Sequence, residues 1–471
     1  MSDSRLALQN SAYAFLALTT QLLGTSVVFF IIARMESISI GDFGRLTFAF
    51  ALAQMIALFF EYGLAPYLSK RIAAKELTRD NERSAYGLHI FLMLAGLTIY
   101  AIIVKLLNLD EVSSQICFWI GASVFVTTSL RFFYGFYQGR ERHNSEFLST
   151  CAEISVQLGA IVYIYSSQLD VLCVAQYYFF ARLIAWIGTF SVFSATDYFM
   201  LPRIDPKFWS RILIEALPFN LTFVAAFAIT SLDTILLQKL APEDPEYQVG
   251  LYQAAIRLVL VPTILATVAT RVFLPQLSRM GGDTTAHLRH LNNILLLLGI
   301  FAGLFFYFQA ESLTVLAYGS DYSEAAHIMA LLSLTLALRF GAAFNLYFTL
   351  SNQMWMRLSF ACIALTSLIG LNYILVPKYG VLGTVYASII THIVYWIPVV
   401  VVMFWQKRDP LLGWRFGYTA LVSAGYGSLL WYLQDLSLWW IVIISIPVTV
   451  LAIAFAIQKD IRAQLFKNLV R

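Results

Sequence analysis

The stretch Val249–Arg279, VGLYQAAIRLVLVPTILATVATRVFLPQLSR, decides the fold. Its apolar run is about one bilayer thick, which predicts a helix that crosses a membrane. Phe43–Arg71, FGRLTFAFALAQMIALFFEYGLAPYLSKR, has the same plan: an aliphatic or aromatic residue with a glycine, a long apolar run, and a P-x-L-S-[K/R] exit. Two copies of one pattern indicate an internal repeat, so we expect two related halves.

The composition places the chain in the membrane. Of its 471 residues, 59% are hydrophobic and only 12% are charged, whereas a typical soluble domain is about 25% charged. The four cysteines lie in or beside apolar runs without C-x-x-C spacing, which is typical of buried thiols. The sequence therefore predicts an all-α polytopic membrane protein, and we expect neither a metal site nor a cofactor.

About fourteen apolar runs are long enough to cross a hydrocarbon core of about 30 Å. The repeated pattern falls in the second and the eighth of them, six apart, so each half should hold six helices. We therefore expect two pseudo-symmetric six-helix bundles, residues 1–205 and 206–409, followed by a pair of additional membrane helices and a cytoplasmic tail in residues 410–471.

The basic residues predict the orientation of the chain. Most of the 31 lysines and arginines fall on the predicted loops that share a side with the amino terminus. Loops rich in Lys and Arg stay in the cytoplasm, so this bias and an even number of spans place both termini inside.

Five arginines fall within the predicted spans, where each costs roughly 2.5 to 3.5 kcal/mol at the bilayer centre unless it has a partner, water or a ligand. Two of them, in the repeat helix, are 14 residues apart, which is close to four helical turns and places them on one face. Pro262 lies between these two, removes a backbone donor and predicts a hinge. The five are Arg131, Arg182, Arg257, Arg271 and Arg339.

Acidic residues are fewer in the spans, and Glu61 and Glu153 are the candidates for charge partners or for coupling to an ion. An interior with more arginines than acids suits an anionic passenger. Arg257 is the strongest candidate for binding it, because it lies in the outer part of the repeat helix.

Structural roles for the other arginines stay open. Arg131 and Arg271 lie near the predicted cytoplasmic ends, where a long side chain can reach the interface, and Arg131 is also placed to pair with Glu153. Arg182 and Arg339 are close to the middle of their spans, where packing inside one bundle and lining a cavity are equally compatible with the sequence.

Several motifs are absent. The sequence has no G-x-x-x-x-G-K-[S/T] loop and no connection long enough for a nucleotide-binding domain. Its predicted outer loops are short, whereas membrane enzymes that act on lipid-linked sugars need a sizeable loop. We therefore expect a transporter rather than an enzyme, and no nucleic-acid partner.

Several short motifs resemble those of the polysaccharide-biosynthesis flippases, which belong to the multidrug, oligosaccharidyl-lipid and polysaccharide exporter superfamily. The resemblance extends over nearly the whole chain, and its motifs are structural. They are Arg34–Gly44 (RMESISIGDFG), Glu61–Leu64 (EYGL), Gln138–Arg142 (QGRER), Asp233–Leu237 (DTILL), Val249–Ala255 (VGLYQAA) and Pro377–Gly380 (PKYG).

The resemblance implies two six-helix bundles around a central cavity that opens to one side of the membrane at a time. Helices one, two, seven and eight line that cavity in relatives, which favours Arg257 and Arg271 over Arg182 and Arg339. The two additional helices at the end of the chain resemble those that form a lipid groove in lipid II flippases.

The predicted function is a flippase of the bacterial inner membrane for an undecaprenyl-diphosphate-linked oligosaccharide, used in O-antigen, capsule or exopolysaccharide assembly. The arginines would hold the diphosphate, and the polymerase and assembly machinery are possible partners. The alternatives are a lipid II flippase, a cation-coupled multidrug exporter, and a structural subunit of the assembly complex.

Overall fold

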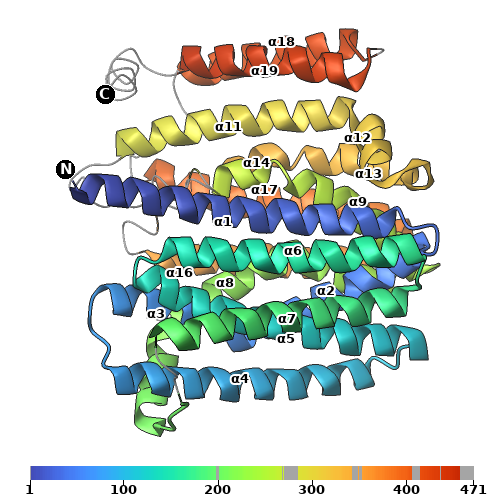
Figure 1. Ribbon diagram of the computed structural model, residues 1–471. Coiled ribbons are helices and arrows are strands. Elements are labelled where there is room, and N and C mark those ends of the chain that lie inside the picture. The colour runs from blue at the N-terminus through green and yellow to red at the C-terminus, as the bar shows by residue number, and fades with distance from the viewer. Residues whose placement is uncertain are drawn as a thin grey trace. The chain divides into compact units, whose positions relative to one another are not determined.

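The computed structural model describes residues 2–197, 201–267, 269, 285–341, 348, 353–405, 414–434 and 436–456, and this part of the chain is helical without a strand (Figure 1). Contacts divide the chain into two compact units. Unit 1 is Met1–Gln253 with Val376–Gly380, and unit 2 is Ala254–Leu375 with Val381–Arg471.

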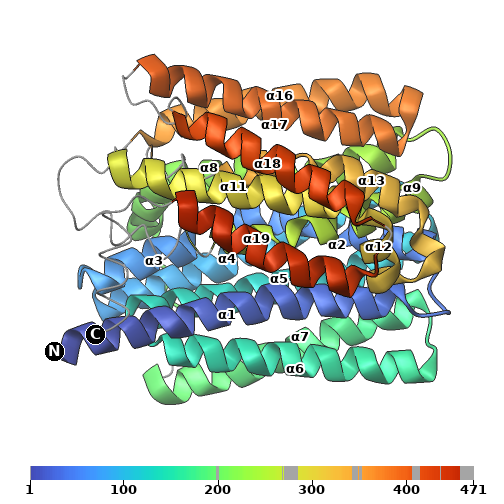
Figure 2. The ribbon, with the colours of Figure 1, turned by 90° about the horizontal axis from the view of Figure 1, so that it is seen from above.

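Unit 1 is a bundle of long helices. In Figures 1 and 2, α1 runs along α6 and α6 along α7, and the contacts of the chain agree. Short polar caps begin several of them, since Ser39 and Asp42 form a capping box and Thr78 and Asp110 accept from backbone amides. The helices are α1 (Ser2–Ala33), α2 (Ile40–Glu61), α3 (Leu64–Ala73), α4 (Arg79–Leu106), α5 (Glu111–Gly139), α6 (His143–Ser167), α7 (Val171–Asp197), α8 (Pro206–Leu240) and the start of α9 (Pro245–Leu260).

Unit 2 mixes long and short helices. Its α11 packs against α13, α14, α18 and α19, so α11 is the central helix of this unit. The helices are α11 (Thr285–Phe308), α12 (Ala310–Tyr318), the 3-10 turn η1 (Ser320–Tyr322), α13 (Glu324–Ser333), α14 (Leu336–Phe340), α16 (Met354–Tyr379), α17 (Val381–Trp405), α18 (Trp414–Tyr432) and α19 (Leu438–Ala456).

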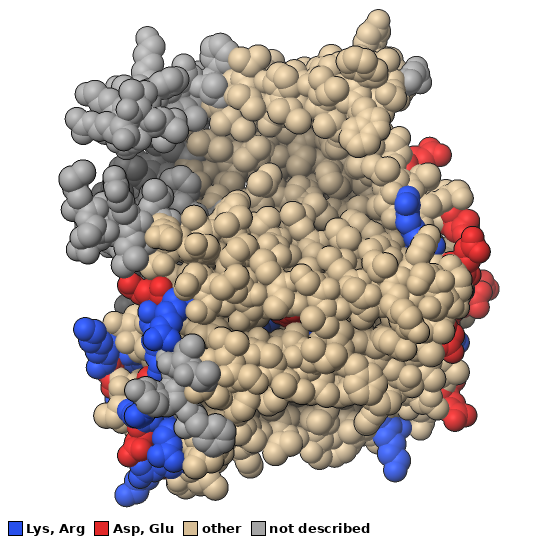
Figure 3. Space-filling view, viewed as in Figure 1, with Lys and Arg blue, Asp and Glu red and all other residues tan. Residues whose placement is uncertain are grey.

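The structure confirms the all-α membrane class. Within the described residues, ten helices are long and apolar enough to cross a membrane. The other four predicted spans fall on shorter helices or on residues outside the described part, so the number fourteen stays a prediction. The same holds for the orientation and for the bundle division at residues 205 and 409. Over unit 1, Figure 3 shows lysines and arginines gathered at the end where α3 lies, with an uncharged belt beside them.

The two copies of the repeat meet in unit 1 through their glycines. Gly44 on α2 lies against the backbone of α9, where an added Cβ would come within 1.8 Å of the Glu246 carbonyl oxygen. Gly250 on α9 lies against the start of α2, where a Cβ would come within 2.2 Å of the Ile40 carbonyl oxygen. Only glycine permits this approach, which explains why both copies carry it at the same place.

A cluster of charges joins α3 to the first turns of α8. The Glu215 carboxylate accepts from Arg211 Nε at 2.9 Å, from the Tyr67 hydroxyl at 2.7 Å and from Arg71 Nη2 at 2.7 Å. Glu215 precedes the apolar part of α8, Asn220–Leu240. The hydrogen bond from Arg211 is the main reason that the pKa of Glu215 is lowered from 4.5 to about 2.

This lowered pKa predicts how stability depends on pH. The carboxylate favours the folded state above its unfolded pKa of 4.5, and that contribution is lost as the pH falls toward about 2. We expect Glu215→Gln to lower the free energy of unfolding by about 1 kcal/mol at pH 7, because the ion pairs are partly exposed. The difference from the unmodified protein should shrink between pH 4.5 and 2 in thermal melts in detergent, and a constant difference would contradict this role.

Candidate functional site

The spans of unit 1 contain a buried ion pair between α6 and α7. Glu153 and Arg182 are only 1% and 6% exposed, and their side chains form a salt bridge. Three further polar groups complete it: the Tyr134 hydroxyl donates to Glu153 Oε2 at 3.3 Å, Gln157 Nε2 donates to Oε1 at 3.4 Å, and Arg182 Nη2 donates to the Tyr178 hydroxyl at 3.1 Å.

Local sequence spacing explains part of this network. Tyr178 and Arg182 are four residues apart on α7, and Glu153 and Gln157 are four apart on α6, so each pair shares a helix face. A buried ion pair is favoured when its remaining donors and acceptors are satisfied, and these neighbours satisfy both carboxylate oxygens of Glu153 and the Nη2 of Arg182. The sequence offered Arg131 as the partner of Glu153; this was wrong, because Arg182 makes the ion pair.

Arg131 and Glu61 lie near this pair. Arg131, on α5, is exposed, and its charge acts both on Glu61 at the end of α2 and on Arg182. Glu61 is 8% exposed. Four of the charged residues that the sequence singled out, Arg131, Arg182, Glu61 and Glu153, thus come together within unit 1.

Arg257 and Arg339 are partly buried in unit 2. The charge of Arg257, on α9, acts on the Tyr318 hydroxyl of α12. Arg339 Nε, on α14, donates to the Thr335 hydroxyl at 3.0 Å, and its charge acts on His392 of α17. Both arginines therefore have neighbours in their own unit, and their role in binding stays a prediction.

The predicted weak point at Pro262 is present in the backbone. The α9 helix ends at Leu260, residues 261 and 262 form a turn, and helical structure resumes at residue 263. Because of this turn, the helix face that carries Arg257 does not run straight on past Pro262. Arg271, which the sequence places on the same face, lies outside the described residues. The action of Pro262 as a hinge stays a prediction.

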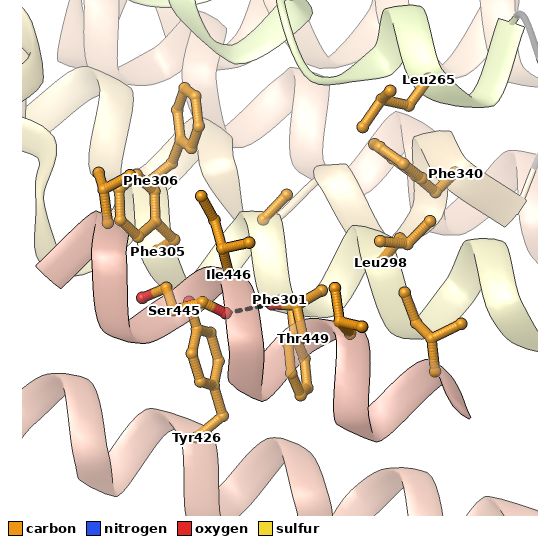
Figure 4. Close-up of a pocket in the computed structure, with 14 residues that line it drawn as sticks. Leu265, Leu298, Phe301, Phe305, Phe306, Phe340, Tyr426, Ser445, Ile446 and Thr449 are labelled. Atoms are coloured by element: carbon orange, nitrogen blue, oxygen red, sulfur yellow. Dashed lines mark hydrogen bonds between the residues drawn. The ribbon is translucent and has the colours of Figure 1, made fainter. Parts of the chain in front are cut away.

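Unit 2 contains an apolar cavity of about 390 Å³ (Figure 4). Tyr426 closes one side by stacking on Phe301, with ring centroids 4.2 Å apart. The Thr449 hydroxyl donates to the Ser445 carbonyl oxygen of its own helix, so it offers no free donor to the cavity. Most of the wall is aliphatic or phenylalanine, from Leu298, Phe305 and Phe306 on α11 and from Ile446, Val450 and Ile453 on α19.

The sequence does not locate this cavity. The resemblance places a lipid groove at the last two helices, but α19 is hydrophobic on all sides, so its sequence does not distinguish the face that lines the cavity. The uncharged polar residues around the Glu153 and Arg182 pair were also missed. For them a signal existed, namely their four-residue spacing from a charged residue on the same helix.

Comparison with known proteins places the chain in a family. The model of the family described as "Polysaccharide biosynthesis protein" matches residues 7–281, more than half of the chain. No curated protein matches it.

Solved structures share the fold at low sequence identity. One is described as "Lipid II flippase MurJ, inward closed conformation" and superposes with a TM-score of 0.71 at 16% identity, covering 98% of this chain and 100% of that one. An inward-facing multidrug resistance MATE family transporter has a TM-score of 0.62 at 15% identity, covering 84% and 99%. A MOP superfamily transporter from Pyrococcus furiosus has a TM-score of 0.58 at 15% identity, covering 85% and 94%.

The matched segment contains both copies of the repeated pattern and the buried ion pair. The fold match extends over nearly the whole chain. The chain therefore belongs to the family described as "Polysaccharide biosynthesis protein".

Proposed function

We propose that this protein turns an undecaprenyl-diphosphate-linked oligosaccharide from the cytoplasmic to the outer leaflet of the bacterial inner membrane by alternating access. The observation that supports this proposal is that one membrane chain has both arginines within its spans and a cavity that is almost wholly apolar. A lipid-linked cargo has an anionic headgroup, which arginines can bind, and a hydrocarbon chain, which an apolar cavity can hold.

The arginines suit the diphosphate. A guanidinium donates two parallel hydrogen bonds to phosphate oxygens and keeps its charge at all physiological pH values. Among the described candidates, Arg131 is exposed and Arg257 and Arg339 are partly buried. Arg182 is engaged by Glu153.

The cavity in unit 2 suits the lipid. Its walls come mainly from α11, α18 and α19, and most of their side chains are aliphatic or aromatic, so they offer apolar contacts to methyl-branched isoprene units. Each CH₂ group removed from water contributes about 0.8 kcal/mol, but within a bilayer the gain comes from close packing instead. The cavity therefore holds the chain in place rather than supplying the driving force.

A lipid II flippase is the second candidate, since its cargo has the same diphosphate and a similar lipid, and the fold likeness to a structure of that description covers 98% of the chain. A cation-coupled drug exporter has less support, because Glu153, one of the two acidic candidates in the spans, is neutralised by Arg182. The polymerase and assembly machinery remain proposed partners.

Transport in reconstituted vesicles tests the proposal. We expect the purified protein to flip a fluorescent lipid-linked oligosaccharide faster than lipid II. Arg257→Ala should slow flipping about tenfold to a hundredfold, because a hydrogen bond to a charged group contributes about 1.5 to 3 kcal/mol. Arg257→Lys should retain part of the rate.

Lys105→Ala provides the matched control, since Lys105 is an exposed cation at the end of α4 and should be dispensable. Equal rates for Arg257→Ala and Lys105→Ala would remove Arg257 from the binding site. Faster flipping of lipid II than of the oligosaccharide would favour the second candidate.

A further inference from the structure

The first turns of α8 precede its membrane span. The apolar span begins at Asn220, so residues 206–217 lie before it. In Figure 1 these turns cross the beginning of α4, whereas α8 as a whole packs mainly against α2. Ile212 and Ala216 are fully buried, in a core cluster to which α4 and α5 also contribute. One side of this short helical segment is therefore packed against protein.

Two contacts of Trp209 fix the depth of the segment. Its indole Nε1 donates to the Ser84 carbonyl oxygen at 2.9 Å, and its ring stacks on Phe91 with centroids 5.7 Å apart. The charged residues at this end of α4 all precede Ser84, and Phe91 is exposed on the apolar span of α4. Trp209 therefore lies where the charged first turns of α4 give way to its lipid-facing surface.

The connection that leads into the segment, residues 201–205, is also fastened to α4. The Arg203 amide donates to the Arg83 carbonyl oxygen at 3.1 Å, and Arg83 Nε donates to the Leu201 carbonyl oxygen at 3.0 Å. Gly87 permits this approach, because an added Cβ would come within 2.5 Å of the Arg203 carbonyl oxygen. The connection and the segment are thus a fixed part of unit 1.

The outer side of this region exposes large apolar side chains. Ile204 and Ile214 are 76% and 71% exposed. Ile214 lies on the side of the segment away from the buried Ile212 and Ala216. Apolar side chains this exposed at the boundary of a span are suited to contact with lipid rather than with water.

Two cations share the face that carries Ile214. Lys207, Arg211 and Ile214 are three to four residues apart, so they lie side by side on the helix. Lys207 is exposed and makes no ion pair with any carboxylate that the structure describes. Arg211 donates to Glu215 through Nε at 2.9 Å, so its two terminal nitrogens can donate to a second anion.

We propose that residues 201–217 bind an anionic phospholipid at the basic end of unit 1. Lys207 and Arg211 donate to the phosphate of the headgroup, because their long side chains reach the phosphate layer from a helix that lies in the interface. Ile204 and Ile214 lie among the upper parts of the acyl chains. This binding goes beyond the proposed function and does not depend on it.

Charge and depth favour a phospholipid over a protein partner. Figure 3 shows lysines and arginines gathered at this end of unit 1, and the basic loops predict that this end is cytoplasmic, where the leaflet is negatively charged. The apolar side chains continue the lipid-facing surface of α4, on which Phe91 and Leu94 are exposed. A bound lipid would hold the connection between the two predicted bundles at the membrane surface.

Native mass spectrometry of the full chain, purified in detergent, tests this site. The probes are phosphatidylglycerol and phosphatidylcholine with the same acyl chains, and the dissociation constant of the first bound lipid is measured for each. Each basic residue near a lipid surface contributes about fivefold to the affinity for an anionic lipid. With two cations at the site, we expect phosphatidylglycerol to bind about tenfold or more tightly than phosphatidylcholine.

Three variants locate the binding. Lys207→Gln should weaken the binding of phosphatidylglycerol about fivefold and leave that of phosphatidylcholine unchanged. Ile214→Asn should weaken the binding of both lipids alike, since it removes a contact with the acyl chains. Lys75→Gln is the matched control, because Lys75 is an exposed cation at the same end, between α3 and α4, and should bind both lipids as the unmodified protein does. Melting temperatures check that each variant is folded.

Three results would overturn the proposal. They are equal affinity for the two phospholipids, an equal loss in Lys75→Gln and Lys207→Gln, and unchanged binding in Ile214→Asn. A competition experiment separates the phospholipid from the proposed cargo. If a farnesyl-diphosphate-linked monosaccharide displaces phosphatidylglycerol from the unmodified protein but not from Lys207→Gln, the segment binds the cargo headgroup and the phospholipid assignment is wrong. The flippase proposal is untouched by each of these results.

Discussion

Arg182→Leu will lower the free energy of unfolding by about 3 to 5 kcal/mol, because it leaves the Glu153 carboxylate buried without its cation. Glu153 is 1% exposed, so water cannot replace the guanidinium. Tyr134 and Gln157 donate to the carboxylate, but neither carries a charge. Thermal melts in detergent, with the amount of folded protein in the membrane, measure the loss.

The double variant Glu153→Leu with Arg182→Leu should recover most of this loss, since replacing a whole buried ion pair by apolar residues is often neutral or stabilising. Arg45→Leu provides the contrast, because Arg45 pairs with Asp42 at 3.3 Å on a partly exposed surface and should cost at most about 1 kcal/mol. If Arg182→Leu were no worse than Arg45→Leu, the pair between α6 and α7 would not hold these helices together.

Gly44→Ala and Gly250→Ala will each destabilise the protein by about 3 kcal/mol, because a single methyl group cannot fit between α2 and α9. The added Cβ would lie 1.8 Å from the Glu246 carbonyl oxygen in one case and 2.2 Å from that of Ile40 in the other. These neighbours are backbone atoms, so the helices themselves must move apart. The melting temperature in detergent measures the effect.

Gly188→Ala on α7 is the matched control. An added Cβ there meets nothing within 4 Å, and alanine favours a helix over glycine by up to about 1 kcal/mol. This variant should therefore melt at the same temperature or slightly higher. Equal melting temperatures for all three alanine variants would show that the contact between α2 and α9 relaxes without cost.

The sequence by itself determined the class of the protein. Apolar runs of bilayer length specify helices locally, because a membrane leaves the backbone no other partner than its own helix. The repeat around Gly44 and Gly250 and the motifs that resemble the polysaccharide-biosynthesis proteins are also local patterns, and the family match agrees with them. The in-span arginines could be found for the same reason, since each is a rare residue in an apolar run.

Only the tertiary structure decided how these residues meet. Whether Glu153 pairs with Arg131 or with Arg182 depends on the rotation of α5, α6 and α7 about their axes, and hydrophobic runs that are apolar on all sides do not specify a rotation. The approach of Gly44 to α9 and the cavity between α11 and α19 join segments far apart in the chain. Such contacts depend on how whole helices pack against one another, and the packing of two helices cannot be predicted from the sequence of either one alone.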